Sequence, residues 1–278
     1  MSLGVVLDVA ALTDPGLKRK VNEDSVLAVD PVFVVADGMG GYEAGDRASA
    51  AVVAAFREHL AGRPDAELVH VRDALMAADV GVQSVAAGTK RGAGSTVSGI
   101  VLVEHEGLAH WLILNVGDSR VYRWYAGELE QLTVDHSLVQ ELVDDGSLTR
   151  EEMQTQANRN VITRAIGAPD STADSWLMPV VDGERLLVCT DGLHSEVADE
   201  GIRATLTMNG RPEQAAAALV QLAKRAGGRD NITVVVLDVR SGGVPEEPGF
   251  DDEDDATLET GPRGTEFEDD TLPVGAAR

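Results

Sequence analysis

Residues 32–50 read VFVVADGMGGYEAGDRASA. An apolar run typical of a buried strand ends at Asp37, and the glycine-rich segment GMGG follows it directly. An aspartate beside a glycine is most often only a turn residue. The alternative is a site at which the backbone comes close to something charged, because glycine permits such close approach. The rest of the sequence decides between these two interpretations.

Three other aspartates occur in a similar setting at the ends of apolar runs. Asp191 lies in LLVCTDG, Asp118 ends WLILNVGD, and Asp230 directly precedes NITVVVLDV. If the strands lie side by side, the four carboxylates can converge, and several carboxylates in one pocket cannot all ionise without cations. Hard divalent ions such as Mg²⁺ and Mn²⁺ prefer oxygen ligands. The sequence therefore predicts a multi-metal site with oxygen ligands.

Other kinds of active site lack their residue patterns in this chain. The six histidines show no HExxH spacing, which argues against a zinc site. The sequence contains no GxxxxGK[ST] motif, no GxGxxG after a strand and no GxSxG motif. Cys189 lies in an apolar run with no arginine placed as in a cysteine-based phosphatase loop, so we interpret it as a small buried hydrophobe. Metal-assisted chemistry on phosphate remains as the prediction.

Composition and charge narrow the class of partner and the compartment. The net charge of −24 argues against nucleic acid and against anionic membrane surfaces as partners. A single cysteine excludes an intrachain disulfide and fits a reducing compartment. The start of the chain, MSLGVVLDVAAL, lacks the basic region of a signal peptide, and no apolar run is long enough to span a bilayer. We therefore expect a cytoplasmic protein without a membrane anchor.

Composition also divides the chain into a globular part and an acidic tail. From Ser241 onward, 38 residues hold 12 Asp and Glu against two Arg, with several Pro and Gly. Such a segment cannot bury enough apolar surface to fold. The chain as a whole is 44% hydrophobic, so the remainder can bury a sizeable core. We expect one domain at residues 3–240 and a disordered tail at 241–278.

Helical periodicity appears in three segments, residues 46–61, 65–86 and 212–226. Short runs rich in Val, Ile and Leu predict strands, and the short turns between many of them favour antiparallel pairing. These runs cover residues 4–10, 25–30, 32–36, 96–103, 109–116, 119–125, 185–190 and 231–239. The helices cluster in two blocks and do not alternate with the strands. The sequence therefore favours an α+β sandwich over a doubly wound sheet.

Taken together, the motifs resemble the PPM/PP2C family of metal-dependent protein Ser/Thr phosphatases, in its bacterial branch. The resemblance covers nearly all of residues 4–239. In chain order the matching motifs are RKVNEDS (19–25), VVADGMGG (34–41), GAGSTV (92–97), VGDSRVY (116–122), LTVDHS (132–137), NVITRAIG (160–167), LLVCTDGL (186–193) and GGRDNITVVVL (227–237). The resemblance implies a central antiparallel β-sandwich flanked by helix pairs in α-β-β-α layers, with the metals in a cleft at one end.

The resemblance also implies a set of metal ligands. Asp37 would bridge two metal ions, and the backbone carbonyl of Gly38 would bind the first. Asp191 and Asp230 would hold the second ion. Asp118 resembles the ligand of a third, weaker ion. The expected cofactors are therefore Mn²⁺ or Mg²⁺, as two core ions with a third beside them.

The remaining site residues have supporting roles in the resemblance. Arg19 matches the phosphate-binding arginine of the family, a role that suits the bidentate guanidinium fork. Glu23 and Asp24 would orient metal-bound waters. Each also has a simpler interpretation, as a solvated charge for Arg19 and as a surface turn for Glu23-Asp24. For Asp118 the simpler interpretation is a structural ion pair with Arg120.

Two further inferences concern residues near this set. Gly94, Ser95 and Thr96 are interpreted as small residues packed in a strand near the site and not as ligands. Met39 cannot donate a proton, whereas some relatives have histidine there as a proposed general acid. Protonation of the leaving group would then need a metal-bound water or another residue.

The resemblance implies an activity. A hydroxide that bridges two metal ions would hydrolyse phosphoserine and phosphothreonine in proteins, in opposition to Hanks-type Ser/Thr kinases. The expected partners are phosphorylated proteins, including such kinases and their targets, and the enzyme is expected to be a monomer. Two alternatives remain open: a pseudophosphatase that only binds partners, and a regulator that acts on anti-sigma-factor partners.

Two further segments, the one at residues 144–166 and the acidic tail, have expected roles of their own. Residues 144–166 correspond to the mobile flap of the family, and Gln156-Ala157 replaces the His-Pro pair that relatives often have. In the tail, DDATLE surrounds Thr257 and DDTLP surrounds Thr271. One hypothesis is that these threonines are phosphorylated and bind a phosphothreonine-reading domain or the cleft. The alternative is a tail that only solubilises the protein.

Overall fold

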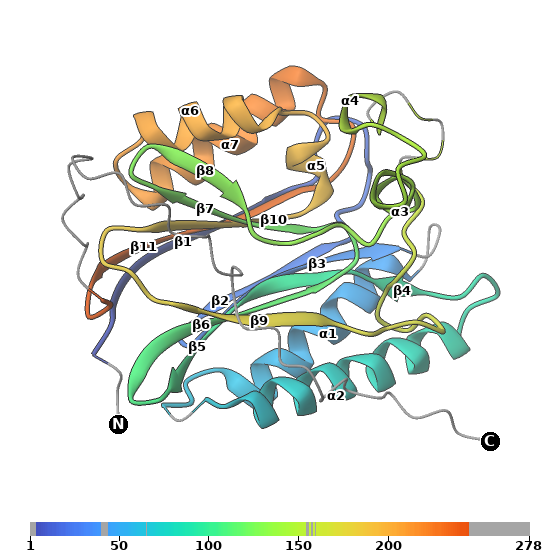
Figure 1. The fold of residues 1–278 in the computed structure, drawn as a ribbon. Coiled ribbons are helices and arrows are strands. Elements are labelled where there is room, and N and C mark those ends of the chain that lie inside the picture. Colours follow the sequence, from blue (N-terminus) through green and yellow to red (C-terminus); the bar gives the residue numbers. More distant parts are fainter. Residues whose placement is uncertain are drawn as a thin grey trace.

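Two antiparallel β-sheets, stacked face to face, form the centre of the fold (Figure 1). The structure is a computed structural model that describes residues 4–39, 44–64, 66–153, 156, 158 and 160–244. The first sheet, here called sheet A, has the strand order β1-β11-β10-β7-β8. Its strands are β1 (Val6–Asp14), β11 (Ile232–Ser241), β10 (Arg185–Cys189), β7 (Arg120–Tyr125) and β8 (Glu128–Gln131).

The second sheet, sheet B, has the strand order β2-β3-β5-β6-β9, and a short strand pairs with the end of β3. Its strands are β2 (Asp24–Val29), β3 (Val32–Met39), β5 (Val97–His105), β6 (Leu108–Val116), β9 (Asp174–Pro179) and the short β4 (Gly94–Ser95). All strand pairs within the two sheets are antiparallel, as the short turns in the sequence predict.

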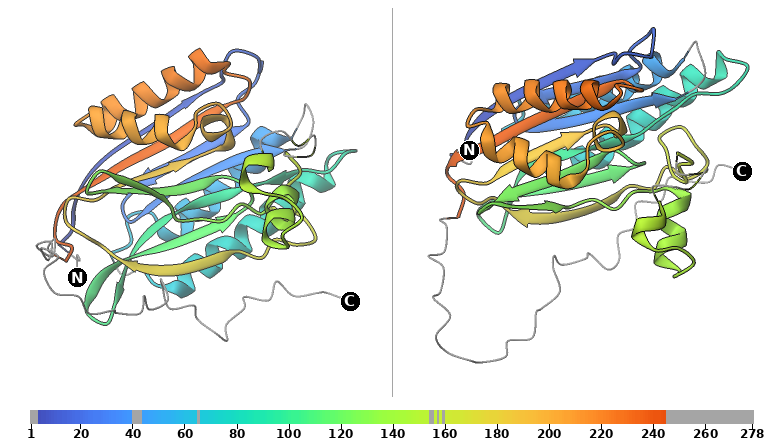
Figure 2. Two further views of the ribbon diagram at one scale, coloured as in Figure 1. Left: turned by 45° about the horizontal axis from the view of Figure 1, so that its top comes forward. Right: turned by 90° about the horizontal axis from the view of Figure 1, so that it is seen from above.

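Helix pairs cover the two outer faces of the sandwich (Figure 1). The helices α1 (Gly45–Leu60) and α2 (Leu68–Ala87) pack on sheet B, and α6 (Asp199–Met208) and α7 (Pro212–Ala226) pack on sheet A. The views in Figure 2 show these pairs on opposite sides of the molecule. The predicted α+β sandwich with α-β-β-α layers is therefore confirmed.

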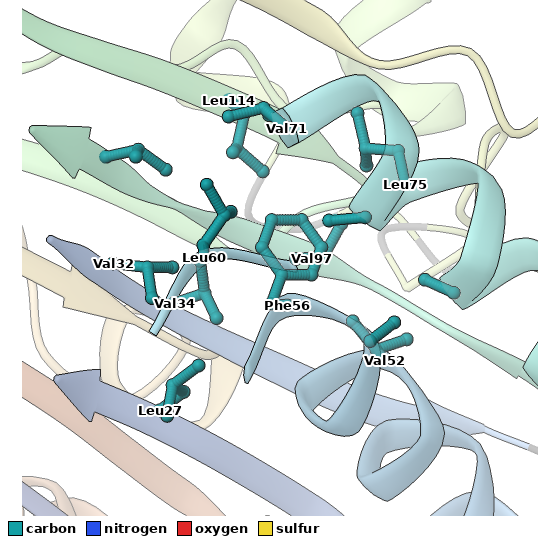
Figure 3. Packing of buried hydrophobic residues seen from close by; sticks show 14 of the residues in the cluster. Leu27, Val32, Val34, Val52, Phe56, Leu60, Val71, Leu75, Val97 and Leu114 are labelled. Carbon is teal, nitrogen blue, oxygen red and sulfur yellow. The ribbon is translucent and has the colours of Figure 1, made fainter. Parts of the chain in front are cut away.

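The apolar run in residues 32–36 is continuous because β3 is buried on both faces. Side chains alternate across a strand, so Val32, Val34 and Ala36 join the cluster under α1 and α2. Phe33 and Val35 point the other way, into the cluster between the two sheets. Figure 3 shows Val32 and Val34 packed near Phe56 and Leu60 of α1. Burial on both faces removes the polar alternation of a half-exposed strand.

The three long predicted helices are confirmed as α1, α2 and α7. Periodicity and apolar runs did not predict the other helices or two of the strands that the described residues contain. The missed elements are β8, β9, α6 and the short α3 (Leu138–Asp144), α4 (Arg150–Met153) and α5 (Asp191–His194). They are short or carry few apolar residues, as in ELEQ of β8. In α6 only Ile202 and Leu206 are buried, which is too few for a clear period.

In the described residues, no helix combines the length and the apolar character needed to cross a membrane. The tail hypotheses for Thr257 and Thr271 lie outside the described residues, as do Gly40, Gly41 and Ala157.

Candidate metal centre and phosphate site

Three of the four predicted aspartates lie at one end of the strands of sheet A. Cys189 at the end of β10 pairs with Arg120 at the start of β7 and with Val234 near the start of β11. Asp118 precedes β7, Asp191 follows β10 and Asp230 precedes β11. The register therefore places all three carboxylates at the same end of this sheet.

Sheet B brings the remaining carboxylates to the same end. Asp37 near the end of β3 pairs with Asp24 at the start of β2. Thr190 and Thr233 of the facing sheet donate their hydroxyl hydrogens to Oδ2 of Asp24, at 2.8 and 2.6 Å. These two hydrogen bonds join the sheets at the end where β4 and α5 lie (Figure 1).

In Asp37-Gly38 and in Asp191-Gly192, contact with distant backbone requires the glycine. A Cβ atom at position 38 would lie 1.9 Å from the carbonyl oxygen of Gly45, and one at position 192 would lie 1.9 Å from that of Asn231. Real Cβ atoms are never so close to a carbonyl oxygen. From sequence, a turn or the close approach of a ligand was expected to explain these glycines, whereas backbone packing within the protein requires both.

Gly45, at the start of α1, has a matching role that the sequence analysis missed. A Cβ atom at this position would lie 2.3 Å from Oε1 of Glu23 and 2.7 Å from the carbonyl oxygen of Gly38. The absence of a side chain leaves both oxygens in place beside each other. The glycine in YEAGD was the available signal, because it follows the GMGG segment closely.

The backbone of Asp37 is fixed by two residues that precede β5. The Asp37 N–H donates to the hydroxyl of Thr96 at 2.9 Å, and the Thr96 N–H donates to the Asp37 carbonyl at 2.9 Å. The hydroxyl of Ser95 donates to the same carbonyl at 3.1 Å. Ser95 and Thr96 are buried. They hold the aspartate by its main chain, which agrees with their interpretation as packed small residues.

The four aspartates of the site are partly exposed, and their carboxyl groups perturb one another. Burial raises the pKa of Asp37 well above its ordinary value, and the charges of Asp24, Asp191, Asp118 and Asp230 raise it further. This repulsion is the one that the sequence pattern predicts for carboxylates in one pocket.

The neighbours of Asp37 respond in the same way. Burial and the charges of Asp191 and Asp135 raise the pKa of Asp118 to about 8. Burial and the charge of Asp230 raise the pKa of Asp191 to about 6, although a hydrogen bond with Asp37 opposes the shift. A positive ion among these groups would be favoured, because it relieves the repulsion that raises their pKa values.

Asp24 is buried beneath the partly exposed carboxylates. Burial raises its pKa to about 7, against the lowering effect of the hydrogen bonds from Thr233 and Thr190. Its second oxygen, Oδ1, is buried and has no hydrogen-bond partner in the described part of the structure. One oxygen therefore ties the two sheets together, and the other remains available to a ligand or a water.

Arg19 lies beside the site and contacts one of the predicted ligands. Its Nη2 donates to Oδ2 of Asp230 at 2.6 Å, and the Arg19 side chain is half exposed. Hydrogen bonding to Asp230 raises the pKa of Arg19. The guanidinium thus lies at the rim of the aspartate cluster and contacts a predicted ligand, while half of its side chain stays exposed to solvent.

The alternative role of Asp118 in an ion pair with Arg120 is wrong. Arg120 makes a bidentate contact with Asp135 instead, at 2.8 Å from Nε and 2.6 Å from Nη2. Asp135 is buried, and the planar guanidinium fork matches its two oxygens. The carboxylate of Asp118 is therefore not committed to Arg120.

Asn231, next to Asp230, was missed by the sequence analysis. Its Nδ2 donates to the carbonyl oxygens of Pro15 and Val21, both at 3.0 Å, and its Oδ1 accepts from the N–H of Glu23 at 2.8 Å. One side-chain amide thus closes both ends of the segment that carries Arg19. The signal in the sequence was weak, because an Asn before a strand is usually a turn residue.

Two histidines that the sequence analysis did not assign hold the loop that carries Asp118. Nε2 of the half-buried His194 donates to the carbonyl of Asp118 at 2.9 Å, and desolvation lowers the pKa of this imidazole to about 3. On the other side, the N–H of Gly117 donates to Nδ1 of His136 at 3.1 Å. Nε2 of His136 therefore carries the hydrogen and donates to Asp174 at 3.0 Å.

The predicted flap is attached next to the site at its C-terminal end. Ser95 and Ile166 exchange two backbone hydrogen bonds, at 3.1 and 2.8 Å. Arg164, within the flap, donates to Asp174 at 2.8 Å. The end of the flap therefore pairs with the residue whose hydroxyl holds the Asp37 carbonyl. Gln156 is exposed to an intermediate degree and belongs to no helix or strand.

The donor set fits hard divalent cations. Oδ1 of Asp191 is buried and accepts no hydrogen bond within the described residues, and the Gly38 carbonyl lies against a position without a side chain. All candidate donors are oxygens, which Mg²⁺ and Mn²⁺ prefer. The described residues contain no three His, Cys, Asp or Glu side chains already gathered closely enough to hold an ion.

Similarity to known proteins agrees with this geometry. Residues 19–224 match the family model described as Protein phosphatase 2C. The serine/threonine protein phosphatase PstP of Mycobacterium tuberculosis is 40% identical over 243 residues, which cover 84% of this chain and 45% of the relative. The chain thus spans less than half the length of that relative. Serine/threonine phosphatase stp of Listeria monocytogenes is 31% identical over 239 residues, covering 81% of this chain and 93% of the relative.

Solved structures show the same fold. The crystal structure of the M. tuberculosis phosphatase PstP/Ppp has a TM-score of 0.79 at 35% identity, covering 85% of this chain and 100% of that chain. The catalytic domain of PstP in complex with two manganese ions has a TM-score of 0.77 at 35% identity, with the same coverage. By sequence, by fold and by the order of its motifs, the chain belongs to the protein phosphatase 2C family.

Proposed function

We propose that the protein is a metal-dependent phosphatase that hydrolyses phosphoserine and phosphothreonine in proteins. The observation that carries this proposal is the group of four aspartates, brought from both sheets to one end of the sandwich with Arg19 at its rim. The names of the relatives PstP and stp support the same activity.

The aspartates are proposed as the metal ligands. Asp37 would bind both core ions, the Gly38 carbonyl would bind the first, and Asp191 and Asp230 would bind the second. Asp118 would hold a third ion. The manganese complex of PstP supports Mn²⁺ or Mg²⁺ as the cofactor. When bound, such ions neutralise charge on the phosphate and lower the pKa of a water that serves as nucleophile.

The other side chains would neutralise the phosphate charge and position waters around the ions. Arg19 would bind phosphate oxygens, and its contact with Asp230 keeps the guanidinium beside the ligands before substrate arrives. Glu23 and Asp24 would orient waters around the ions, a role that the unpartnered Oδ1 of Asp24 supports. Met39 carries no transferable proton, so the leaving oxygen must receive its proton from another group.

The proposal includes partners and compartment. Phosphorylated proteins would be the substrates, including Ser/Thr kinases and their targets, and the enzyme would act as a monomer. A cytoplasmic location is supported by the acidic charge and by the single cysteine, Cys189, which is buried. The catalytic domain would occupy residues 3–240, with the flap at 144–166 and the acidic tail after it.

The two alternatives fit less well. A pseudophosphatase would be expected to have lost metal carboxylates, whereas Asp37, Asp191 and Asp230 are all present at the site. A phosphatase dedicated to anti-sigma-factor partners usually lacks the complete RKVNED segment, which this chain has. A phosphoprotein phosphatase therefore accounts for more of the residues.

The test is hydrolysis of a phosphothreonine peptide by the full chain with and without Mn²⁺. Activity should require Mn²⁺ or Mg²⁺, and Asp37→Asn and Asp191→Asn should each lower it by about 100-fold or more, because each removes a ligand charge from the site. Full turnover in excess chelator would contradict the proposal.

Arg57→Gln is the matched control for these variants. Arg57 is exposed on the last turn of α1, and the structure gives it no place near the aspartates. Its removal should leave the rate unchanged, so a loss in the aspartate variants alone would identify the site.

A further inference from the structure

The segment Gly16–Asn22 displays three consecutive cations beside the aspartate site. Lys18, Arg19 and Lys20 are all exposed, within an exposed stretch that runs from Leu17 to Val21. The whole chain has only four lysines and a net charge of −24. One lysine on each side of Arg19 therefore makes this segment locally basic in a strongly acidic protein.

This segment is held closely against the site at its base. A Cβ atom at Gly16 would lie 2.1 Å from the carbonyl oxygen of Asp230, and the N–H of Leu17 donates to the carbonyl of Gly228 at 2.7 Å. The amide of Asn231 closes the two ends of the segment. The position of the lysines relative to the site is therefore fixed by the main chain beneath them.

Two acidic neighbours of the segment, Asp14 and Asp230, are already paired with other cations. Asp14 contacts Lys224 at 2.7 Å, and Asp230 contacts Arg19. Within the described residues, neither Lys18 nor Lys20 has an ion pair or a side-chain hydrogen bond. Their charge is therefore directed to solvent, where an arriving substrate meets it.

The reach of these lysines matches residues that flank a phosphorylated side chain. Neighbouring Cα atoms are about 3.8 Å apart, and each ammonium stands on a flexible four-carbon stem. An extended peptide advances about 3.3 Å per residue. With the phosphate on Arg19, the ammonium groups can thus meet side chains within about four positions of the phosphorylated residue.

We propose that Lys18 and Lys20 select substrates that carry Asp or Glu within about four positions of the phosphorylated residue. The proposal rests on the proposed phosphatase function and adds a substrate class to it. Acidic flanking residues interact with the lysines equally before and during the reaction, so the lysines act on KM and leave kcat unchanged. The contacts are exposed, and salt weakens them.

The experiment compares phosphothreonine peptides that differ only in their flanks, which are acidic, neutral or basic. The full chain in Mn²⁺ should show a kcat/KM about five- to tenfold higher for the acidic peptide than for the neutral one, with the basic peptide lowest. The preference should shrink as ionic strength rises from about 0.1 M to about 1 M, where the Debye length falls from about 10 to about 3 Å.

The variant Lys18→Gln/Lys20→Gln should lose the preference through a higher KM for the acidic peptide. Its rate on p-nitrophenyl phosphate, which has no flanking residues, should equal that of the wild type. The control with the same change in charge is Arg57→Gln/Arg211→Gln. Gly45 at the start of α1 and Gly227 after the end of α7 mark the ends of these helices nearest the site. Arg57 and Arg211 lie near the opposite ends of α1 and α7, about 18 Å or more away along each helix axis. The control should keep the full preference.

The outcomes separate this proposal from the proposed function. Equal kcat/KM for all three peptides, or a preference that survives in the double lysine variant, overturns the role of the lysines while the phosphatase function stands. Absence of any Mn²⁺-dependent hydrolysis, even of p-nitrophenyl phosphate, overturns both. Loss of the preference in the arginine control as well would assign it to overall charge and not to the lysines.

Discussion

At the scale of single residues, the site depends on two glycines, which have no side chain, as much as it depends on carboxylates. Gly38 and Gly192 each lie where a side chain would collide with backbone, at Gly45 and at Asn231. The contact at Gly192 brings the start of α5 against the segment that carries Asp230. Two ligand segments that are far apart in sequence are therefore in direct backbone contact.

Gly192→Ala tests this contact. The added methyl group would meet the carbonyl of Asn231 at 1.9 Å, so the two segments must separate. We expect a loss of about 2–3 kcal/mol in the free energy of unfolding and a lower affinity for Mn²⁺. Urea denaturation in chelator measures the first, and Mn²⁺ titration of the fluorescence or heat signal measures the second.

The control is Gly210→Ala. Gly210 follows α6, and a Cβ atom there has no neighbour within 4 Å. This variant should change stability by no more than about 0.5 kcal/mol. Equal effects at both positions would show that the loss comes from glycine replacement in general and not from the backbone contact.

The carboxylates could be located from sequence, but the residues that hold them could not. Asp37, Asp118 and Asp191 end apolar runs, and this pattern is visible in one dimension. Asn231 and His194 act by hydrogen bonds to main-chain atoms of other segments. Such contacts leave no pattern of side-chain types, because any backbone carbonyl can accept them.

At the scale of elements, α5 is the link between the proposed core ligands and Asp118. This short helix begins with Asp191 and ends with His194, whose Nε2–H donates to the Asp118 carbonyl. Asp118 and Asp191 repel each other, as the effect of Asp191 on the pKa of Asp118 indicates. The histidine therefore holds together two segments whose carboxylates favour separation.

Substitution of His194 tests the link. His194→Ala would leave a carbonyl without its donor, and we expect a loss of about 1–3 kcal/mol in stability. We also expect a higher Mn²⁺ concentration for half-maximal activity, because the Asp118 loop is released. His194→Gln retains an N–H donor and should recover part of both effects. Identical Mn²⁺ dependence in all three proteins would argue against a positioning role.

The elements themselves were predicted in proportion to their burial and length. The eight apolar runs correspond to β1, β2, β3, β5, β6, β7, β10 and β11, and the long helices have clear apolar faces. β9, with the sequence DSWLMP, and α6 have mixed patterns, because each is buried over only a few residues. Their positions are set by the neighbouring elements and not by local periodicity.

At the scale of the whole molecule, the carboxyl groups of the aspartate cluster couple stability to pH. The pKa values of Asp24, Asp191 and Asp118 in the folded chain are about 7, about 6 and about 8, above the ordinary value for aspartate. Between about pH 4 and pH 8 these carboxyl groups, together with Asp37, bind more protons in the folded protein than in the unfolded chain. His194, with a folded pKa of about 3, has the opposite effect below about pH 6.5, but it is one group against four. Stability must fall as pH rises through this range.

We therefore expect the Tm in excess EDTA to be higher at about pH 5 than at about pH 8. Mn²⁺ at the higher pH should restore much of the loss, since an ion that binds only the folded state stabilises it. Differential scanning calorimetry measures both effects. Asp118→Asn removes one titrating group and should flatten the slope of Tm against pH. A Tm that rises with pH in EDTA would contradict this account.

The layered architecture could be predicted from sequence because four layers require strands that are buried on both faces. The sequences of β3 and β11 are continuous apolar runs, which is the pattern of such strands. How the two sheets meet at the site was not accessible. That junction depends on Thr190 and Thr233, whose hydroxyls reach one oxygen of Asp24 across the sandwich. Threonine is common in strands for other reasons, so its presence alone predicts no such contact.

The closure of residues 16–22 by Asn231 has a consequence for how this protein can diversify. The clamp uses main-chain atoms of Pro15, Val21 and Glu23, so it does not depend on which side chains occupy positions 18 and 20. Substitutions at positions 18 and 20 can therefore change these side chains while the fold and the proposed metal ligands stay the same. A laboratory library limited to these two codons would vary the proposed substrate preference while the proposed metal ligands stay unchanged.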